Sequence, residues 1–173
     1  MARINRVASD CRSRGPTDQM KIGLLVNPMA GLGGAVALKG SDGEALQQQA
    51  LSREGRGRGA ARVALFLQSL RDANDELSVI AHADTELIEW YTWGGAMGAD
   101  YLEEQDFAHT VLGGYEGVSN ATDSVAATRA FIQQGVDLLV FVGGDGTARD
   151  VLSAATDAIS CLGLPAGVKM HSG

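Results

Sequence analysis

The sequence predicts an α/β protein built on an open, doubly wound, mostly parallel sheet. Short aliphatic runs alternate with longer segments of helical spacing, and glycine-rich turns follow several of the runs. Residues 137–142 (Asp-Leu-Leu-Val-Phe-Val) have the composition of a strand that is buried on both faces of a parallel sheet. The length of 173 residues is that of one domain.

Composition and charge narrow the class of protein. Hydrophobic residues make up 45% of the chain and aromatic residues only 5%, so the core is expected to be aliphatic and rich in alanine. The net charge of −7 disfavours nonspecific binding to nucleic acid or to an anionic membrane. Cys11 and Cys161 have neither metal-ligand spacing nor the pattern of a disulfide framework. A reducing cytoplasm is therefore the expected location. No run is long enough to cross a bilayer, and no apolar signal core follows the N-terminus.

The first third of the chain contains one strand and a long glycine-rich stretch. Residues 1–19 have no periodicity and are predicted to be a disordered tail, or sequence upstream of a true start at Met20; a basic arm for nucleic acid or a transit peptide is the alternative. Residues 21–27 are predicted to form the first buried strand. The glycines after it lack the G-x-G-x-x-G spacing, so a dehydrogenase is a poor fit. Lys39 lies in this stretch, where it either reaches a phosphate or is solvated.

Helices and strands then alternate. Ser41 and Glu44 have capping-box spacing for a helix over residues 42–51, and the Arg-Gly alternation of residues 53–59 predicts a flexible break. Residues 60–73 have helical spacing, and residues 77–81 are either a short strand or a continuation of that helix. A strand is predicted over 86–93, a helix over 97–104 and a short strand over 109–112. Tyr91 and Trp93 are expected in the core, although stacking on a base is the alternative.

The last third has the clearest signals. A helix over residues 121–134 is bounded by Asn120, a good cap, and by Gly135, which suits a helix end. The strand over 137–142 follows, then a helix to about residue 158 and a fifth parallel strand over 159–164. These alternations complete the predicted doubly wound sheet.

The turn after residue 142 is the candidate catalytic site. Residues 143–150 read Gly-Gly-Asp-Gly-Thr-Ala-Arg-Asp, with Thr147 predicted as the cap of a helix and Asp150 in the capping-box position. A strand, a glycine turn and a helix start present backbone N–H groups and a positive dipole to an anion. Asp145 would repel a phosphate bound there unless it acts through a divalent cation or accepts a proton from a hydroxyl. The turn therefore predicts phosphoryl transfer.

Several stretches together resemble a known family. Gly-Gly-Asp-Gly-Thr at residues 143–147 is similar to the signature of the NAD kinase and diacylglycerol kinase superfamily. Residues 27–34 with 39–43, residues 143–150 and residues 163–172 resemble its ATP-NAD kinase-like branch, which includes the acetoin-catabolism X proteins. The resemblance extends from about residue 20 to residue 173.

This resemblance implies a Rossmann-like domain that transfers the terminal phosphoryl group of ATP, or of polyphosphate, to the 2′-hydroxyl of the adenosine ribose of NAD, with Mg²⁺ or another divalent metal. Asp145 would be the catalytic base, or the carboxylate that orients the hydroxyl and the metal, and no residue is assigned as a dedicated metal ligand. Arg149 would face the nucleotide or pair with Asp150, and Lys169 would meet a phosphate or carboxylate. The expected nucleotide-binding residues are Asn27, Gly31, Gly33, Gly34, Lys39, Gly143, Gly144, Gly146, Thr147, Arg149 and Lys169.

The resemblance also sets expectations about the whole protein and leaves rival functions open. Residues 20–173 are predicted to be the N-terminal nucleotide-binding domain, truncated before the family's C-terminal β-rich domain, and the full-length protein is expected to be a homo-oligomer. The resemblance does not decide whether this chain catalyses the reaction without the second domain. One rival is a lipid kinase of the diacylglycerol kinase type, which would need an apolar acceptor pocket. The other is a non-catalytic nucleotide-binding or regulatory protein of the acetoin-catabolism X type.

Overall fold

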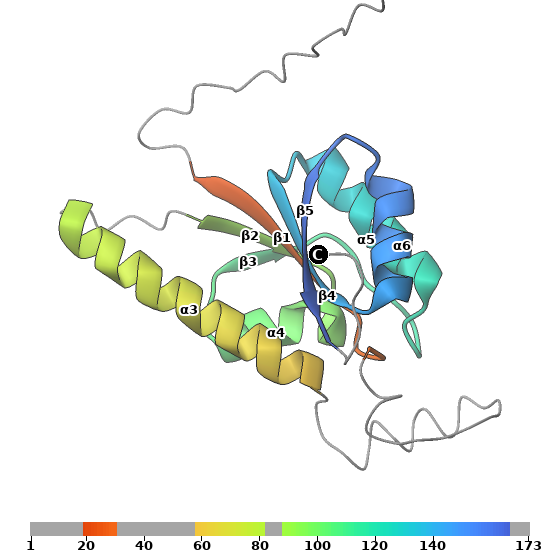
Figure 1. Cartoon of the computed structure of the whole chain (residues 1–173), viewed down its shortest axis with the longest axis horizontal. Coiled ribbons are helices and arrows are strands. Elements are labelled where there is room, and N and C mark those ends of the chain that lie inside the picture. The colour runs from red at the N-terminus through yellow and green to blue at the C-terminus, as the bar shows by residue number, and fades with distance from the viewer. Residues whose placement is uncertain (1–18, 31–57, 82–87, 167–173) are drawn as a thin grey trace, which may run out of the picture.

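The structure is a computed structural model that describes residues 19–30, 58–81 and 88–166, and it confirms the α/β fold class (Figure 1). Within these residues strands alternate with helices, in the order β1 (Met20–Val26), α3 (Arg58–Ala81), β2 (Ile88–Thr92), the 3₁₀ turn η1 (Gly95–Met97), α4 (Ala99–Glu104), β3 (His109–Val111), α5 (Ala121–Gln134), β4 (Leu138–Gly143), α6 (Asp145–Ala155) and β5 (Ser160–Pro165). No helix in this part of the chain is both long and apolar enough to span a bilayer.

The five strands form one sheet in which every neighbouring pair is parallel, with the spatial order β3-β2-β1-β4-β5. The chain starts in the middle, moves outward through β2 and β3, and then crosses to β4 and β5. Helices α3 and α4 lie on one side of the sheet and α5 and α6 on the other (Figure 1). The strand order reverses between β1 and β4, so the carboxyl ends of these two strands mark the switch point where open α/β sheets bind ligands.

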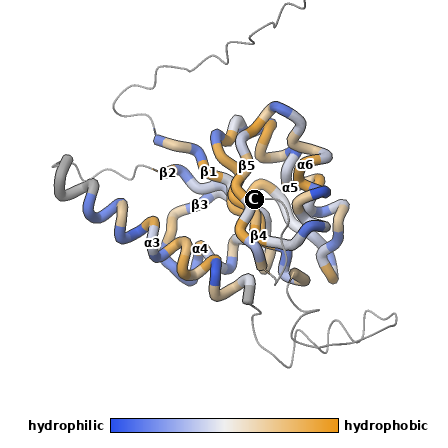
Figure 2. Tube along the Cα trace, viewed as in Figure 1, coloured by the Kyte–Doolittle hydropathy of each residue, from blue (hydrophilic) through white to orange (hydrophobic). Residues whose placement is uncertain are grey.

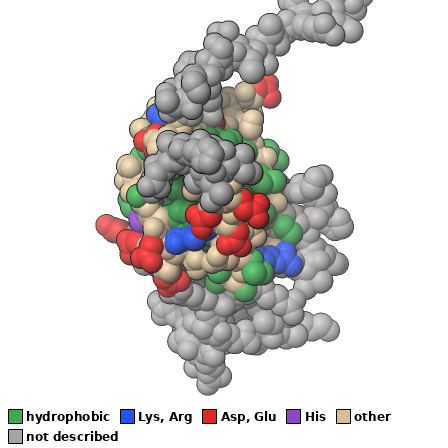
Figure 3. Space-filling view, turned by 90° about the vertical axis from the view of Figure 1, so that its left-hand side faces the viewer, with side chains coloured by type: hydrophobic (Ala, Val, Ile, Leu, Met, Phe, Trp, Pro, Cys, Tyr) green, Lys and Arg blue, Asp and Glu red, His purple; other side chains and the backbone are tan. Residues whose placement is uncertain are grey.

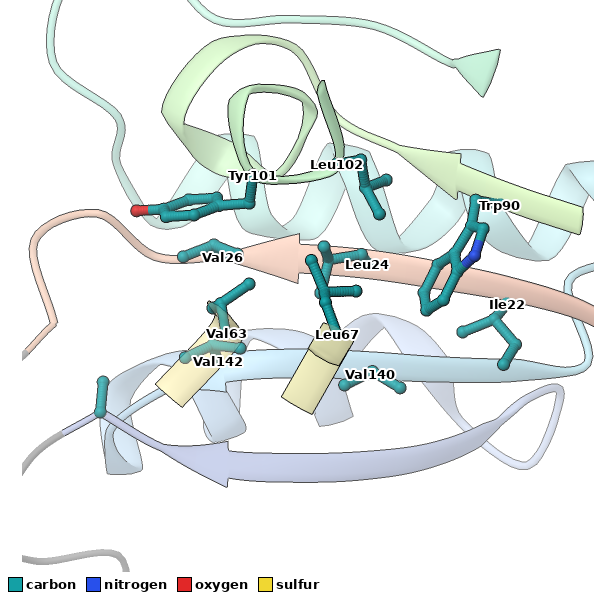
Figure 4. Close-up of a cluster of buried hydrophobic side chains, with 11 residues drawn as sticks. Ile22, Leu24, Val26, Val63, Leu67, Trp90, Tyr101, Leu102, Val140 and Val142 are labelled. Atoms are coloured by element: carbon teal, nitrogen blue, oxygen red, sulfur yellow. The ribbon is translucent and has the colours of Figure 1, made fainter. Parts of the chain in front are cut away.

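The face covered by α3 and α4 is packed with aliphatic side chains and a few aromatic ones (Figure 4). Val63 and Leu67 of α3 are fully buried there, as the helical spacing predicts, and Leu102 of α4 packs beside them. The strands contribute Ile22, Leu24, Val26, Trp90, Val140 and Val142. Alternate strand residues therefore bury against these helices, as expected for a strand that is apolar on both faces.

The opposite face packs against α5 and α6, and the tube around β4 in Figure 2 is largely hydrophobic. Leu139 and Phe141 of β4 meet Phe131 of α5 and Val151 of α6. Tyr91 and Trp93 belong to the same cluster, with only 3% and 8% of their surface exposed. The prediction that these two aromatic residues are core residues is confirmed.

Helix α5 has the predicted bounds because both of its ends are specified locally. The Asn120 side chain accepts a hydrogen bond from the Thr122 N–H, and the Asp123 side chain accepts one from the Asn120 N–H, which completes a capping box. Gly135 ends the helix in the left-handed region, at φ 73°.

Helix α3 differs from its prediction. It begins at Arg58, inside the predicted flexible break of residues 53–59, and it continues to Ala81, so the predicted end at residue 73 is wrong and residues 77–81 continue the helix. The Arg62 side chain donates to the Pro165 carbonyl, and the helix packs across the sheet, so tertiary contacts override the local Arg-Gly signal. Residues 53–57 and the predicted helix 42–51 lie outside the described residues.

Candidate functional site

A backbone hydrogen bond connects the carboxyl ends of the neighbouring strands β1 and β4. Val26 and Val142 are register partners in the parallel ladder, and the Asn27 N–H donates to the Val142 carbonyl at 2.8 Å. The next residue of each strand, Asn27 on one side and Gly143 on the other, therefore leaves the sheet at the switch point. Sequence segments 120 residues apart, Asn27 and Thr147, meet here.

The Asn27 side chain connects the two segments. Its Nδ2 donates to Thr147 Oγ1 at 2.8 Å, and its Oδ1 accepts from the Met29 N–H at 2.9 Å, which shapes the turn after β1. Thr147 is 3% exposed and Asn27 is half-buried, so this hydrogen bond is partly shielded from water. The sequence placed both residues at the site but missed their direct contact. The available signal was that each follows a buried parallel strand.

The start of α6 corrects the prediction that Thr147 caps the helix. The helix begins at Asp145, its cap residue is Gly144, and no side chain caps it. Thr147 is the third helical residue, and its hydroxyl accepts from Asn27. The first intrahelical bond runs from the Ala148 N–H to the Gly144 carbonyl at 3.0 Å. The backbone N–H groups from residue 144 to residue 147 precede that bond, so they form the positive end of the helix.

The three glycines of this turn have different surroundings. A Cβ built on Gly143 would lie 2.4 Å from both Cβ and Oγ1 of Thr147, so the close approach of strand and helix requires glycine there. A Cβ built on Gly144 or Gly146 would meet no described atom within 4 Å. The open space beside these two backbone positions can admit a ligand atom.

The charged residues of the turn lie on the first two turns of α6. Asp145 is the first helical residue and half-buried, where the helix dipole favours a carboxylate. Arg149 is exposed and lies in the second turn of the helix, not in the first, and its Nε donates to the Asp145 carbonyl at 3.4 Å. This contact folds Arg149 back along its own helix.

Five of the predicted nucleotide-binding residues lie outside the described residues: Gly31, Gly33, Gly34, Lys39 and Lys169. Over the described ranges, no three or more His, Cys, Asp or Glu side chains gather in a way that could hold a metal ion.

The Asn27–Thr147 hydrogen bond is expected to support the local stability of the site. Asn27→Ala should lower the free energy of unfolding by about 1–3 kcal/mol, because it leaves a buried hydroxyl without its donor. Thr147→Val should cost less on its own, and the two changes should be non-additive by about 0.5–3 kcal/mol, as for residues in contact. Urea unfolding of the two single variants and the double variant measures this coupling. Additive losses would show that the two side chains act independently.

A second pair of glycine turns lies at the same edge of the sheet, beyond β2 and β3. The Gly94 N–H donates to the Gly113 carbonyl at 2.8 Å, and the Trp93 ring covers Gly113 so closely that a Cβ there would lie 2.3 Å from it. Sequence reasoning treated these glycines only as strand ends. Tyr115 follows this turn, and burial raises the pKa of its hydroxyl above 10.0, with the Asp100 carboxylate acting in the same sense.

Tyr115 is expected to make the fold less stable at alkaline pH. Because the pKa is raised in the folded state, the unfolded chain loses this proton first, and stability should fall as pH rises above about 10. Tyr115→Phe should remove the part of this fall in stability that comes from Tyr115, and it should leave the free energy of unfolding at neutral pH nearly unchanged. Urea unfolding of both proteins at about pH 8 and about pH 11 measures the difference. Parallel losses in the two proteins would exclude Tyr115 as the titrating group.

Comparison with known proteins agrees with this architecture. Searches of curated proteins and of solved structures gave no match. Residues 22–173 match the family model for the ATP-NAD kinase N-terminal domain, and this range covers all of the sheet except the first two residues of β1, together with the glycine turn. This chain therefore belongs to the ATP-NAD kinase family, and the domain it carries is the family's N-terminal one.

Proposed function

We propose that the protein transfers the terminal phosphoryl group of ATP, or of polyphosphate, to the 2′-hydroxyl of the adenosine ribose of NAD. The family is one of kinases, so phosphoryl transfer is the general activity, and the choice of NAD as acceptor is the proposal. In this reaction the acceptor hydroxyl forms a new bond to phosphorus and loses a proton, while ADP or shortened polyphosphate leaves.

One observation carries the proposal: a carboxylate is the first residue of a helix that starts at the switch point beside two glycines with open space. Gly144 and Gly146 leave room for phosphate oxygens to approach the N–H groups of the first turn. Asp145, between them, is the group that can accept the proton of the attacking hydroxyl or orient it. The Asn27–Thr147 bond holds the first turn of α6 against the end of β1.

A divalent metal fits this arrangement only together with the substrate. The described residues offer no cluster of protein ligands, whereas Mg²⁺ in kinases is commonly held by one or two carboxylates and by substrate phosphates. Asp145 is the carboxylate of this turn that would contribute. When bound, the metal would neutralise the negative charge that develops on the transferred group.

The proposal is tested by measuring NADP formation by the purified chain. NAD and Mg²⁺ are supplied with ATP in one assay and with polyphosphate in another, and the product is detected with an NADP-specific dehydrogenase. Formation of NADP with either donor supports the proposal. Binding of ATP and NAD without turnover would favour a non-catalytic regulatory protein instead, and phosphorylation of diacylglycerol in place of NAD would favour a lipid kinase.

A further inference from the structure

A separate pocket lies near the opposite, amino-terminal edge of the sheet. It has a volume of about 180 Å³ and lies between α3, the start of β2 and the segment that joins α4 to β3. A water molecule needs about 10–15 Å³ by the same kind of measure, so the pocket has room for a small metabolite. Sites for drug-sized ligands are larger, at about 300–1,000 Å³. We call it the Arg71 pocket, after the cation in its wall.

The guanidinium group of Arg71 is held in the wall of the pocket by an aromatic contact. Its guanidinium carbon lies 4.7 Å from the centre of the Phe107 ring, a cation–π contact that fixes the group by its face. Its Nε is buried and has no hydrogen-bond partner in the described part of the chain. The guanidinium lines the pocket, and carboxylates and phosphates are the groups that match its planar set of N–H donors best.

Two acidic side chains in the wall determine which anions the pocket would favour. Asp75 and Asp106 also line the pocket, and both are exposed residues, so they lie towards its mouth. On the face turned towards the viewer in Figure 3, acidic side chains lie on both sides of a basic group near the centre. Two carboxylates would repel phosphate or a simple organic acid, but they would attract a ligand that also carries an ammonium group.

The inner wall is apolar and aromatic. Trp90 and Phe107 pack against each other with their ring centres 5.6 Å apart, and Leu70 and Ile88 complete this side. Trp90 is almost fully buried, and its indole nitrogen lies on the edge of the ring turned towards the starts of the strands (Figure 4). The wall therefore suits a short hydrocarbon chain.

We propose that the Arg71 pocket binds a free α-amino acid with a small apolar side chain. The carboxylate pairs with the Arg71 guanidinium, the ammonium group faces Asp75 and Asp106, and the side chain lies against Trp90 and Phe107. The pocket is built from elements other than the turn at Gly143–Thr147, so it is a second site whose occupancy does not require the nucleotide.

Binding is measured on the whole chain by calorimetry and by tryptophan fluorescence, with L-leucine, L-valine and L-methionine as probes. At least one should bind with a dissociation constant of about 1 mM or lower. For leucine, 4-methylpentanoate lacks the ammonium group and 3-methylbutylamine lacks the carboxylate, and each should bind at least about tenfold more weakly. The proposal is wrong if none of the three amino acids binds at about 10 mM, or if 4-methylpentanoate or inorganic phosphate binds as tightly as the best amino acid.

Variants locate the site. Arg71→Met keeps an unbranched chain beside Phe107 and should weaken amino-acid binding at least about tenfold, whereas Arg62→Met, on the same helix outside the pocket, should not. Asp75→Asn should also weaken binding, and Asp72→Asn, an exposed neighbour outside the pocket, serves as its control. Asp75 is exposed, so its variant remains informative if Arg71→Met does not fold. Unchanged binding in Asp75→Asn, or in a folded Arg71→Met, would overturn the assignment.

Discussion

Asp145→Asn is expected to lower kcat for NADP formation by about 10²–10⁴-fold, the usual contribution of a positioned acid or base. The amide keeps the size of the side chain but cannot accept the hydroxyl proton and is a poor ligand for Mg²⁺. Stability should change by less than about 1 kcal/mol, because the side chain is partly exposed and the favourable interaction of its charge with the helix dipole is of that size. Steady-state kinetics and a urea melt of the same preparation measure both quantities.

Asp150→Asn is the matched control for this variant. Asp150 lies on the same helix and is also half-buried, but it is one turn further from the glycine turn. Its replacement should leave kcat within about twofold of the wild-type value. A larger fall would show that kcat depends on the total negative charge of α6 and not on Asp145 alone. If Asp145→Asn retained most of its activity, the proposed role of that carboxylate would be wrong even if the chain is a kinase.

The sequence was sufficient where the structure is determined locally or by burial on both faces. The aliphatic run before the glycine turn became β4, inside the sheet between β1 and β5, because a strand that is apolar on both faces has no other stable place. Helix α5 was predicted to the residue because Asn120 and Gly135 fix its ends through their own side-chain and backbone preferences. The position of the glycine turn at a carboxyl edge followed from the same reasoning.

The sequence was insufficient where distant segments decide the outcome. Thr147 and Asp150 have the spacing of a capping box, yet the cap residue is Gly144, three residues earlier, because the Thr147 side chain points inward and accepts a hydrogen bond from Asn27. Gly144, the true cap, has no side chain and therefore no capping signature. The Arg71 pocket was missed for a similar reason. Neither Arg71 nor Phe107 belongs to a sequence motif, and they come into contact only because the sheet brings α3 beside the segment before β3.

Gly143→Ala is expected to lower the stability of the fold, whereas Gly146→Ala, only three residues away, is expected to lower the affinity for ATP. At Gly143 the new methyl group would lie 2.4 Å from Thr147 Cβ, and even Thr147→Ala would not remove that atom. The strand and the helix must then move apart, and unfolding should become easier by about 3 kcal/mol or more, the upper range for overpacked sites. Thermal or urea unfolding measures this loss.

At Gly146 the new methyl group meets no described protein atom within 4 Å, so the protein itself gives no steric reason for glycine. Replacement by alanine in the first turn of α6 should leave stability unchanged or raise it by up to about 1 kcal/mol. The same methyl group would occupy the space in which we place phosphate oxygens, so ATP affinity should fall by at least about tenfold, or about 1.4 kcal/mol. A Gly146→Ala protein that is stable but binds ATP poorly would identify this glycine as a ligand contact. Unchanged ATP binding would mean that the phosphates approach α6 from elsewhere, and Asp145 would then need a different role.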